Sequence, residues 1–191
     1  METASGATDL TGRMLIAMPG MGDPRFDHSL IYMCAHSDEG AMGLIVNKPS
    51  ADVTMDGLLE QLSITPGEGL DLRHVHFGGP VEMGRGFVLH SPDYRSELTT
   101  LQVDEAFAMT GTLDVLEHIA KGDGPLLWMA MLGYSGWGPG QLENELAENA
   151  WLVCDASPEL VFSTTDSAKW EAALNSLGIA AHVLSGEGGR A

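Results

Sequence analysis

The segment Leu126–Gly140, LLWMAMLGYSGWGPG, carries the clearest structural pattern in this chain. Its first part, Leu126–Tyr134, is almost continuously apolar, which is typical of a strand that is covered on both faces. The glycines of Gly136–Gly140 then suit a turn, and Gln141–Asn149 carries two leucines at helical spacing. The segment therefore predicts a buried strand, a glycine turn and a helix.

Further strands and helices are predicted on either side of this segment. Short apolar stretches between Gly, Pro or Asp indicate strands, and apolar residues at helical spacing after the capping residues Thr54 and Thr112 indicate helices. The strands His74–Phe77 and Gly86–His90 are expected to pair across a loop that holds Arg85. The remaining predicted strands are Met14–Ala17, Leu30–His36, Met42–Val46, Val103–Thr110 and Trp151–Cys154, and the remaining predicted helix is Asp166–Leu177.

The order of these elements predicts the fold class. Strands come in a block before helices begin to alternate with them, which favours a mixed α+β protein over a doubly wound parallel sheet. No internal repeat or linker interrupts the chain. We therefore expect a single domain over about residues 10–184, between a flexible N-terminus of residues 1–9 and a flexible C-terminal tail of residues 185–191.

Composition excludes several classes of protein. The chain has 191 residues, is 44% hydrophobic and carries a formal net charge of −18. A real core is therefore expected, and wholesale disorder is not. Nucleic acid would meet a repulsive field, and the nine basic residues include no adjacent pair. Direct nucleic-acid binding is not expected.

Cysteine usage and hydropathy bear on the compartment. The two cysteines, Cys34 and Cys154, are too few for a disulfide framework and favour a reducing compartment. The acidic N-terminal stretch has no features of a signal peptide. The longest apolar run, Leu126–Leu132, is far shorter than the ~20 residues that span a bilayer. No membrane partner is expected.

Two pairs of side chains invite a metal or thiol hypothesis. Cys34 and His36 lie two residues apart on a predicted strand, as do His74 and His76, so each pair is expected on one face. If the two strands were neighbours, His36, His74 and His76 would be candidate zinc ligands, although this spacing is not a standard zinc pattern. Alternatively, His36 lowers the pKa of a reactive Cys34. The competing interpretation is a buried thiol and ordinary histidines.

Established fingerprints of catalysis and of cofactor binding are incomplete. Trp137 replaces the last glycine that a nucleophile elbow at Ser135 would need. Arg85 and Gly86 stand where a P-loop needs Lys and Ser or Thr, and Gly20–Gly22 lacks the third glycine of a dinucleotide-binding turn. We therefore expect no cofactor and assign no catalytic residue.

A polar cleft is the most specific binding hypothesis. Asn47 and Arg85 would line it with His90 and hold an acidic ligand, although Asn47 is equally suited to a turn. Gly136 and Gly140 permit close approach of a ligand, whereas Glu143 would repel an added phosphate from the helix that follows. The full candidate surface is Asn47, Gly78, Gly79, Pro80, Arg85, His90, Gly136, Trp137, Gly140, Gln141 and Glu143.

Several motifs resemble one bacterial family. The stretches Phe77–Val81 (FGGPV) and Arg85–His90 (RGFVLH) are similar to the YqgE/AlgH family. The resemblance extends to Gly40–Asn47 (GAMGLIVN) with Pro49, and to Gly133–Glu143 (GYSGWGPGQLE). Glu145, Trp151, Phe162 and Trp170 continue it in the same order. The resemblance thus covers nearly the whole chain.

The resemblance implies a cytoplasmic protein with a mixed, strongly curved sheet packed by several short helices. It brings no catalytic residues, and some family members carry the label of transcriptional regulator. We expect a non-enzymatic binding or regulatory module that acts through an unknown protein partner or a small acidic ligand. The alternative is a thiol-based enzyme or redox sensor that uses Cys34 with His36.

Overall fold

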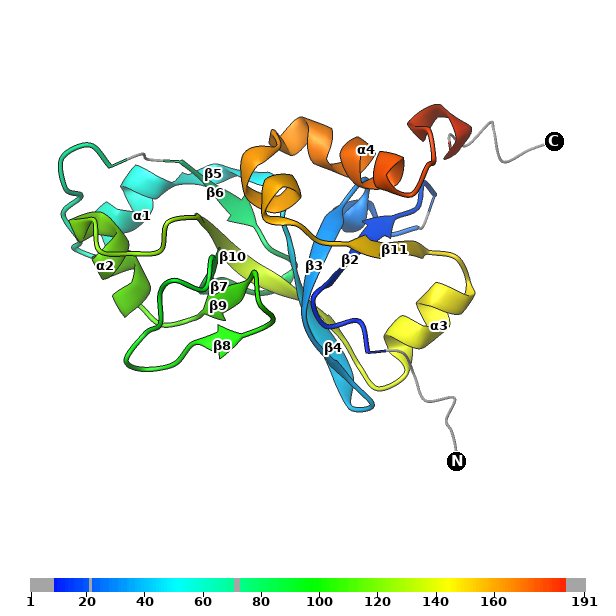
Figure 1. Ribbon diagram of the computed structural model, residues 1–191, viewed down its shortest axis with the longest axis horizontal. Helices are drawn as coiled ribbons and strands as arrows, with labels where there is room; N and C mark the ends of the chain where they lie inside the picture. Colours follow the sequence, from blue (N-terminus) through cyan, green and yellow to red (C-terminus); the bar gives the residue numbers. More distant parts are fainter. Residues whose placement is uncertain (1–8, 21, 71–72, 185–191) are drawn as a thin grey trace.

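The computed structural model describes residues 9–20, 22–70 and 73–184, and the predicted flexible ends lie outside these residues except for Asp9. Its strands form one mixed, curled sheet with helices packed on it, so the predicted α+β class is confirmed (Figure 1). The ten strands of the described chain are β2 (Arg13–Ala17), β3 (Leu30–Ser37), β4 (Gly40–Ile45), β5 (Pro49–Thr54), β6 (His74–Phe77), β7 (Val81–His90), β8 (Leu101–Gln102), β9 (Ala108–Thr110), β10 (Trp128–Trp137) and β11 (Trp151–Asp155).

The helices are short and several have recognisable ends. Thr54 caps α1 by accepting a hydrogen bond from the Gly57 amide, and left-handed Gly122 ends α2. None of the described helices is long and apolar enough to cross a membrane. The helical elements are η1 (Pro24–Phe26), α1 (Met55–Gln61), α2 (Asp114–Lys121), α3 (Gln141–Ala147), η2 (Glu159–Ser163), α4 (Asp166–Ser176) and η3 (Ala181–Leu184).

Strand β10 is the centre of the sheet, as the apolar segment predicts. Its first half pairs antiparallel with β7 and, at Met131–Leu132, parallel with β6. Its second half, Ser135–Trp137, pairs antiparallel with β4. The main strand order is β11-β2-β3-β4-β10-β7-β9-β8, with β5 and β6 as a branch. Strand β10 therefore joins two halves of the sheet, which lie on either side of it in Figure 1.

Three glycines allow two backbones to touch where β6 and β4 meet on β10. A Cβ on Gly79 would lie 2.1 Å from the carbonyl carbon of Tyr134, and a Cβ on Gly133 would lie 2.2 Å from the carbonyl oxygen of Gly79. Gly78 donates to the Leu132 carbonyl (2.8 Å) and accepts from the Ile45 amide (2.9 Å). Gly133 also has a φ of +78°, which favours glycine. We call Gly78, Gly79 and Gly133 the glycine crossing.

The core divides according to the faces of the sheet. The concave face holds the first cluster, where Tyr32 meets Phe107 and α4 contributes Trp170. The outer face of the β2–β3–β4 half packs on Leu142 of α3. The outer face of the other half packs on α1 and α2, for example through Leu116. Alternate residues of each strand thus serve opposite clusters, as strand geometry requires.

Three predictions around β7 and β9 are wrong. Strands β6 and β7 do not pair with each other, because β10 lies between them. Arg85 lies within β7 instead of a loop, since the strand starts at Val81 and its first half is glycine-rich and exposed. The stretch Val103–Thr110 is not one strand: Asp104 accepts hydrogen bonds from the amides of Ala106 and Phe107 and turns the chain between β8 and β9.

Three other elements differ from expectation. Strand β5 was not expected, because it begins with Pro49, is mostly exposed and pairs with β6 alone. Gly136 belongs to β10 instead of a turn, since its partner Met42 continues the ladder as far as Trp137. Leu113, and not Thr112, occupies the N-cap position of α2.

We expect Gly79→Ala to lower the free energy of unfolding by about 3 kcal/mol or more, because the new Cβ overlaps the Tyr134 backbone. Urea denaturation followed by circular dichroism measures the loss. Gly138→Ala is the matched control, since its Cβ would meet nothing within 4 Å. Equal stability of the two variants would contradict the proposed role of the crossing.

Candidate functional site

An open cleft lies between the β3–β4 hairpin and the β7–β9 strands. Its volume is about 780 Å³. The structure brings Arg85, Gly136 and Trp137 of the predicted surface to this cleft, together with Cys34 and His36. The apolar part of its lining includes Met42, Phe87, Leu101, Met109 and Tyr134.

Arg85 is the cationic group of this cleft. Its guanidinium lies over the Phe87 ring, 5.0 Å from the centroid, and its Nη1 is 3.9 Å from Oε1 of Glu82. Glu82 Oε2 also accepts a hydrogen bond from the Tyr134 hydroxyl (3.2 Å). The Arg85 side chain makes no hydrogen bond to another described residue. Its N–H donors are therefore available to an acidic group in the cleft.

Cys34 and His36 do not share a face of β3, contrary to the prediction. The register with β4 shifts between Met33 and Ala35, so Cys34 is an extra residue in the strand. Its side chain packs in the concave core, and burial raises the pKa of the thiol to about 12. The bulge sends His36 toward α3. The pairing that would activate a thiol is therefore not made.

His36 is held by two hydrogen bonds of its own. Its Nδ1 accepts from the Leu10 amide (3.0 Å), so its Nε2 carries the proton and donates to Oε2 of Glu143 (2.8 Å). The hydrogen bond from His36 lowers the pKa of Glu143. His36 therefore links Leu10 and α3 to the β3–β4 hairpin.

The predicted metal ligands do not converge. His74 and His76 are in β6, whose neighbours are β5 and β10, whereas His36 is in β3. Across residues 9–20, 22–70 and 73–184, no three His, Cys, Asp or Glu side chains are placed to hold a metal ion together.

The predicted cleft of Asn47, Arg85 and His90 does not exist as one site. Asn47 accepts from the Leu30 amide (2.9 Å) and donates to the His28 carbonyl (2.8 Å), which fixes the start of β3. His90 is completely buried, donates to the Ser91 carbonyl and accepts from the Thr110 hydroxyl. Burial lowers the pKa of His90, which keeps the imidazole neutral. Both side chains therefore have structural partners.

The remaining predicted residues belong to the frame of the site. Gly78 and Gly79 are buried in the glycine crossing, and Pro80 follows them. Gly140 takes a left-handed conformation at the start of α3, and Gln141 bonds to Gly138 and Glu145.

Glu145 is the centre of the network on α3. One carboxylate oxygen, Oε1, accepts from the indole N–H groups of both Trp137 (2.9 Å) and Trp151 (2.8 Å). The other, Oε2, accepts a hydrogen bond from the side-chain Nε2 of Gln141 (3.0 Å). The helix face with Gln141 and Glu145 is thus partly used within the molecule, and not only as the solvated surface that the sequence indicates.

A polar cluster that the sequence analysis missed lies where α4 meets β6. Asp166 Oδ2 is 2.9 Å from His76 Nε2, and Asp166 Oδ1 is 2.9 Å from Lys169 Nζ. Lys169 also donates to the Val46 carbonyl (2.8 Å) and is only 1% exposed. The sequence feature that could have revealed this cluster is the position of Lys169 on the buried face of α4, beside Trp170 and four residues before Ala173.

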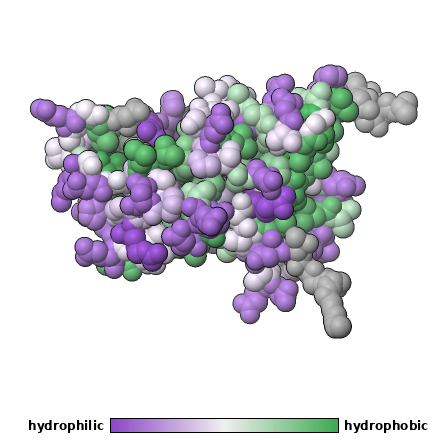
Figure 2. Space-filling view, viewed as in Figure 1, coloured by the Kyte–Doolittle hydropathy of each residue, from purple (hydrophilic) through white to green (hydrophobic). Residues whose placement is uncertain are grey.

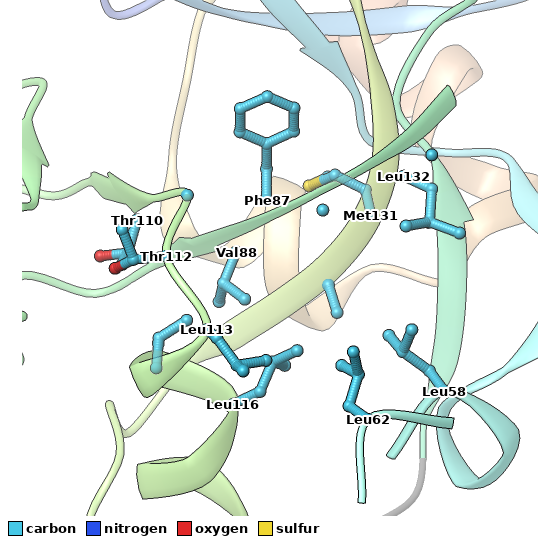
Figure 3. A pocket seen from close by; sticks show the side chains of 15 residues that line it. Leu58, Leu62, Phe87, Val88, Thr110, Thr112, Leu113, Leu116, Met131 and Leu132 are labelled. Atoms are coloured by element: carbon cyan, nitrogen blue, oxygen red, sulfur yellow. The ribbon is translucent and has the colours of Figure 1, made fainter. Parts of the chain in front are cut away.

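An apolar hollow of about 200 Å³ lies between α1, α2 and the sheet. Figure 3 shows Leu58, Leu62, Val88, Leu113 and Leu116 gathered around it. None of its lining residues carries a charge, and the hydroxyls that line it already bond to His90 and Asp114. The hollow therefore offers a ligand apolar contact without a directing polar group.

We expect Cys34 to resist thiol-reactive reagents in the folded protein. In a Cys154→Ser variant at about pH 8, its reaction should be slower than in the urea-unfolded chain by roughly 1000-fold, because the raised pKa leaves little thiolate. Stopped-flow absorbance with a disulfide reagent measures both rates. A folded-state rate equal to that of an exposed thiol would contradict this expectation.

Sequence comparisons find relatives over nearly the whole chain. The family described as AlgH-like (DUF179) matches residues 14–182. A UPF0301 protein of Ruegeria pomeroyi is 59% identical over 184 residues, which is 96% of this chain and 100% of that protein. A UPF0301 protein of Rhodospirillum rubrum is 50% identical over 182 residues, covering 95% of this chain and 94% of that protein.

Solved structures agree with the sequence relatives. The solution structure of the AlgH protein from Pseudomonas aeruginosa has a TM-score of 0.79 and 40% identity, covering 99% of this chain and 100% of that one. A crystal structure of a Corynebacterium diphtheriae protein has a TM-score of 0.69 at 19% identity, covering 91% and 90%, and shows the shared fold alone. The motifs around the glycine crossing and the full-length matches together place this chain in the YqgE/AlgH family.

Proposed function

We propose that the protein is a non-enzymatic regulatory module that binds a small acidic ligand in the cleft beside Arg85. The observation that carries the proposal is the Arg85 guanidinium, which faces the cleft without a hydrogen bond to another described residue. Its neighbour Glu82, at 3.9 Å, is too distant for a hydrogen bond. The N–H groups of the guanidinium can therefore donate hydrogen bonds to a ligand carboxylate.

The size and lining of the cleft support a small molecule. Its volume of about 780 Å³ lies within the range of ligand sites, roughly 300–1,000 Å³. Phe87 and Tyr134 meet edge to face at 5.9 Å, and Met42 and Met109 add flexible apolar surface. A ligand with an apolar body and one acidic group would match this lining.

The charge of the molecule supports action through a protein partner rather than through DNA. The chain carries a net charge of −18, and Figure 2 shows hydrophilic residues over much of the visible face, beside apolar areas. Arg85 is paired loosely with Glu82, and a duplex would have to overcome the repulsion of the whole surface. Cys34 and Cys154 are both free, in keeping with a cytoplasmic location.

The thiol-based alternative has less support. Cys34 is buried with a raised pKa, and His36 turns away from it to Glu143. Ser135, the other nucleophile of the central segment, is fully buried and donates its hydroxyl to the Gly78 carbonyl (3.2 Å). Ser135 is not among the residues that line the cleft, and Cys34, which does line it, is 2% exposed and has a thiol whose raised pKa keeps it protonated.

We expect Arg85→Ala to weaken the binding of carboxylates by about tenfold or more, because a charge-assisted hydrogen bond is lost. The wild-type protein would first be screened by thermal shift against benzoate, hexanoate and succinate, and the best ligand then titrated by calorimetry. Arg95→Ala is the matched control, since Arg95 is exposed and outside the cleft.

Two results would overturn the proposal. One is equal affinity of the Arg85 and Arg95 variants for the ligand that binds the wild type. The other is a reproducible turnover that Arg85→Ala abolishes, which would make the protein an enzyme. A duplex that binds tightly at low salt would refute the exclusion of DNA.

A further inference from the structure

Two glycines of β7 line the apolar hollow between α1, α2 and the sheet. The backbone does not require glycine there, because neither Gly84 nor Gly86 takes a left-handed φ. Packing does not require it either. A Cβ on Gly84 would meet nothing within 4 Å, and a Cβ on Gly86 would meet the Leu132 side chain at 3.8 Å, an ordinary contact. The glycines of the crossing differ, since they have no room for a Cβ.

A side chain at position 86 would occupy part of the hollow. Gly86 lies two residues before Val88 in the regular part of β7, so the two share a face of the strand. Val88 lines the hollow, and so does Leu132, which the new Cβ would touch. Glycine inside a strand often marks the close approach of a ligand or of another backbone. Outside β7, the only described backbone atom within 4 Å of that Cβ is the Met131 carbonyl oxygen of the β7–β10 ladder, at 4.0 Å. Gly86 thus keeps the hollow open, and no second backbone accounts for it.

The leucines around the hollow are only partly covered. Leu58 and Leu62 are half-buried, and Leu113 is 46% exposed. Figure 3 shows them on different sides of one space, with Leu116 and Val88 beside them. The volume of this space is about 200 Å³, and an apolar cavity of roughly 150 Å³ can stay dry and bind benzene. A molecule with one or two rings would therefore fit and cover these leucines.

The polar groups of the lining exclude a charged occupant. None of the lining residues is charged. The Thr110 hydroxyl bonds to His90 Nε2 and to the Thr100 hydroxyl, both at 2.8 Å, and the Thr112 hydroxyl donates to Asp114. A charged group would lose its hydration in the hollow without gaining a partner from these side chains.

The charge of the neighbouring helices disfavours a second copy of the chain as the occupant. The exposed charged side chains of α1 and α2 are Asp56, Glu60, Glu117 and Lys121, so acidic groups outnumber basic ones. The whole chain carries a net charge of −18. Two copies that met through this face would repel each other, whereas an uncharged small molecule meets no such barrier.

We propose that the hollow binds one uncharged apolar molecule of about the size of benzene or indole. Its ring lies against Leu132 and the leucines of α1 and α2, in the space that a side chain at position 86 would take. Figure 3 shows the Phe87 side chain pointing away from Leu58 and Leu116, toward the other face of β7. The hollow and the Arg85 cleft are thus separate sites, and neither proposal depends on the other.

Methyl-labelled NMR of the whole chain tests the proposal without any substitution. Indole should shift the methyl signals of Leu58, Leu62 and Leu116 and give NOEs to them, with a Kd of about 1 mM or tighter. Leu30 and Leu44 in the concave core should not respond. Toluene should act as indole does, whereas benzylammonium, its charged counterpart, should shift the same methyls about tenfold less.

Filling the hollow should remove the site. We expect Gly86→Val to weaken the binding of indole by about tenfold or more, because the isopropyl group takes the space of the ring. Its melting temperature should not fall, since β-branched residues suit a strand. Gly138→Val is the matched control, because a Cβ on Gly138 would meet nothing within 4 Å and Gly138 lies outside the hollow.

A charge at the mouth of the hollow provides a second test. Leu113 occupies the N-cap position of α2, where aspartate is favoured, so Leu113→Asp should fold. It should also weaken the binding of indole by about tenfold, because the carboxylate would have to lose water beside the ring. Leu126→Asp is the matched control, since Leu126 is 78% exposed and outside the hollow. Arg85→Ala should leave the affinity for indole unchanged.

Three outcomes would overturn the inference. In the first, neither indole nor toluene shifts the methyls around the hollow, or benzylammonium shifts them as strongly as toluene. In the second, Gly86→Val and Leu113→Asp bind indole as tightly as their controls do. In the third, the wild type sediments as a dimer that Leu113→Asp dissociates, so that a second copy covers the hollow.

Discussion

Close contact between two backbones at the glycine crossing makes the arrangement of the whole sheet possible. One edge of a strand can pair with two neighbours only if one neighbour ends where the other begins. Gly78 lies at this point between β6 and β4, because it bonds to Leu132 of β10 and to Ile45 of β4. The two halves of the sheet can then turn toward each other and enclose a common core. The open side between them becomes the cleft beside Arg85.

The sequence predicts those parts of the fold that depend on local patterns of apolar residues. Strand β10 is buried on both faces, and its apolar run shows this. Strand β6 has the predicted bounds His74–Phe77. Strand β5 was missed because its stability comes from pairing with β6 and not from burial of its own side chains. Which strands pair depends on contacts between distant residues, which no local pattern contains.

The candidate site was predictable only in part, for a related reason. Arg85 was expected beside an acidic ligand, and it lies in a cleft without a hydrogen-bonding partner among the described residues. The bulge at Cys34 reverses the faces of the residues after it, so the spacing of Cys34 and His36 misleads. Asp166 and His76 are 90 positions apart, and only the tertiary fold brings them together.

The late position of β10 in the chain has a consequence for biosynthesis. Strands β4, β6 and β7 all precede it, yet each needs it as a neighbour. During translation these strands leave the ribosome first, and the apolar faces of β6 and β7 stay uncovered until residue 137 has emerged. Strand β11, the partner of β2, emerges later still. Strand β10 can therefore pair with its neighbours only after most of the polypeptide has been synthesised.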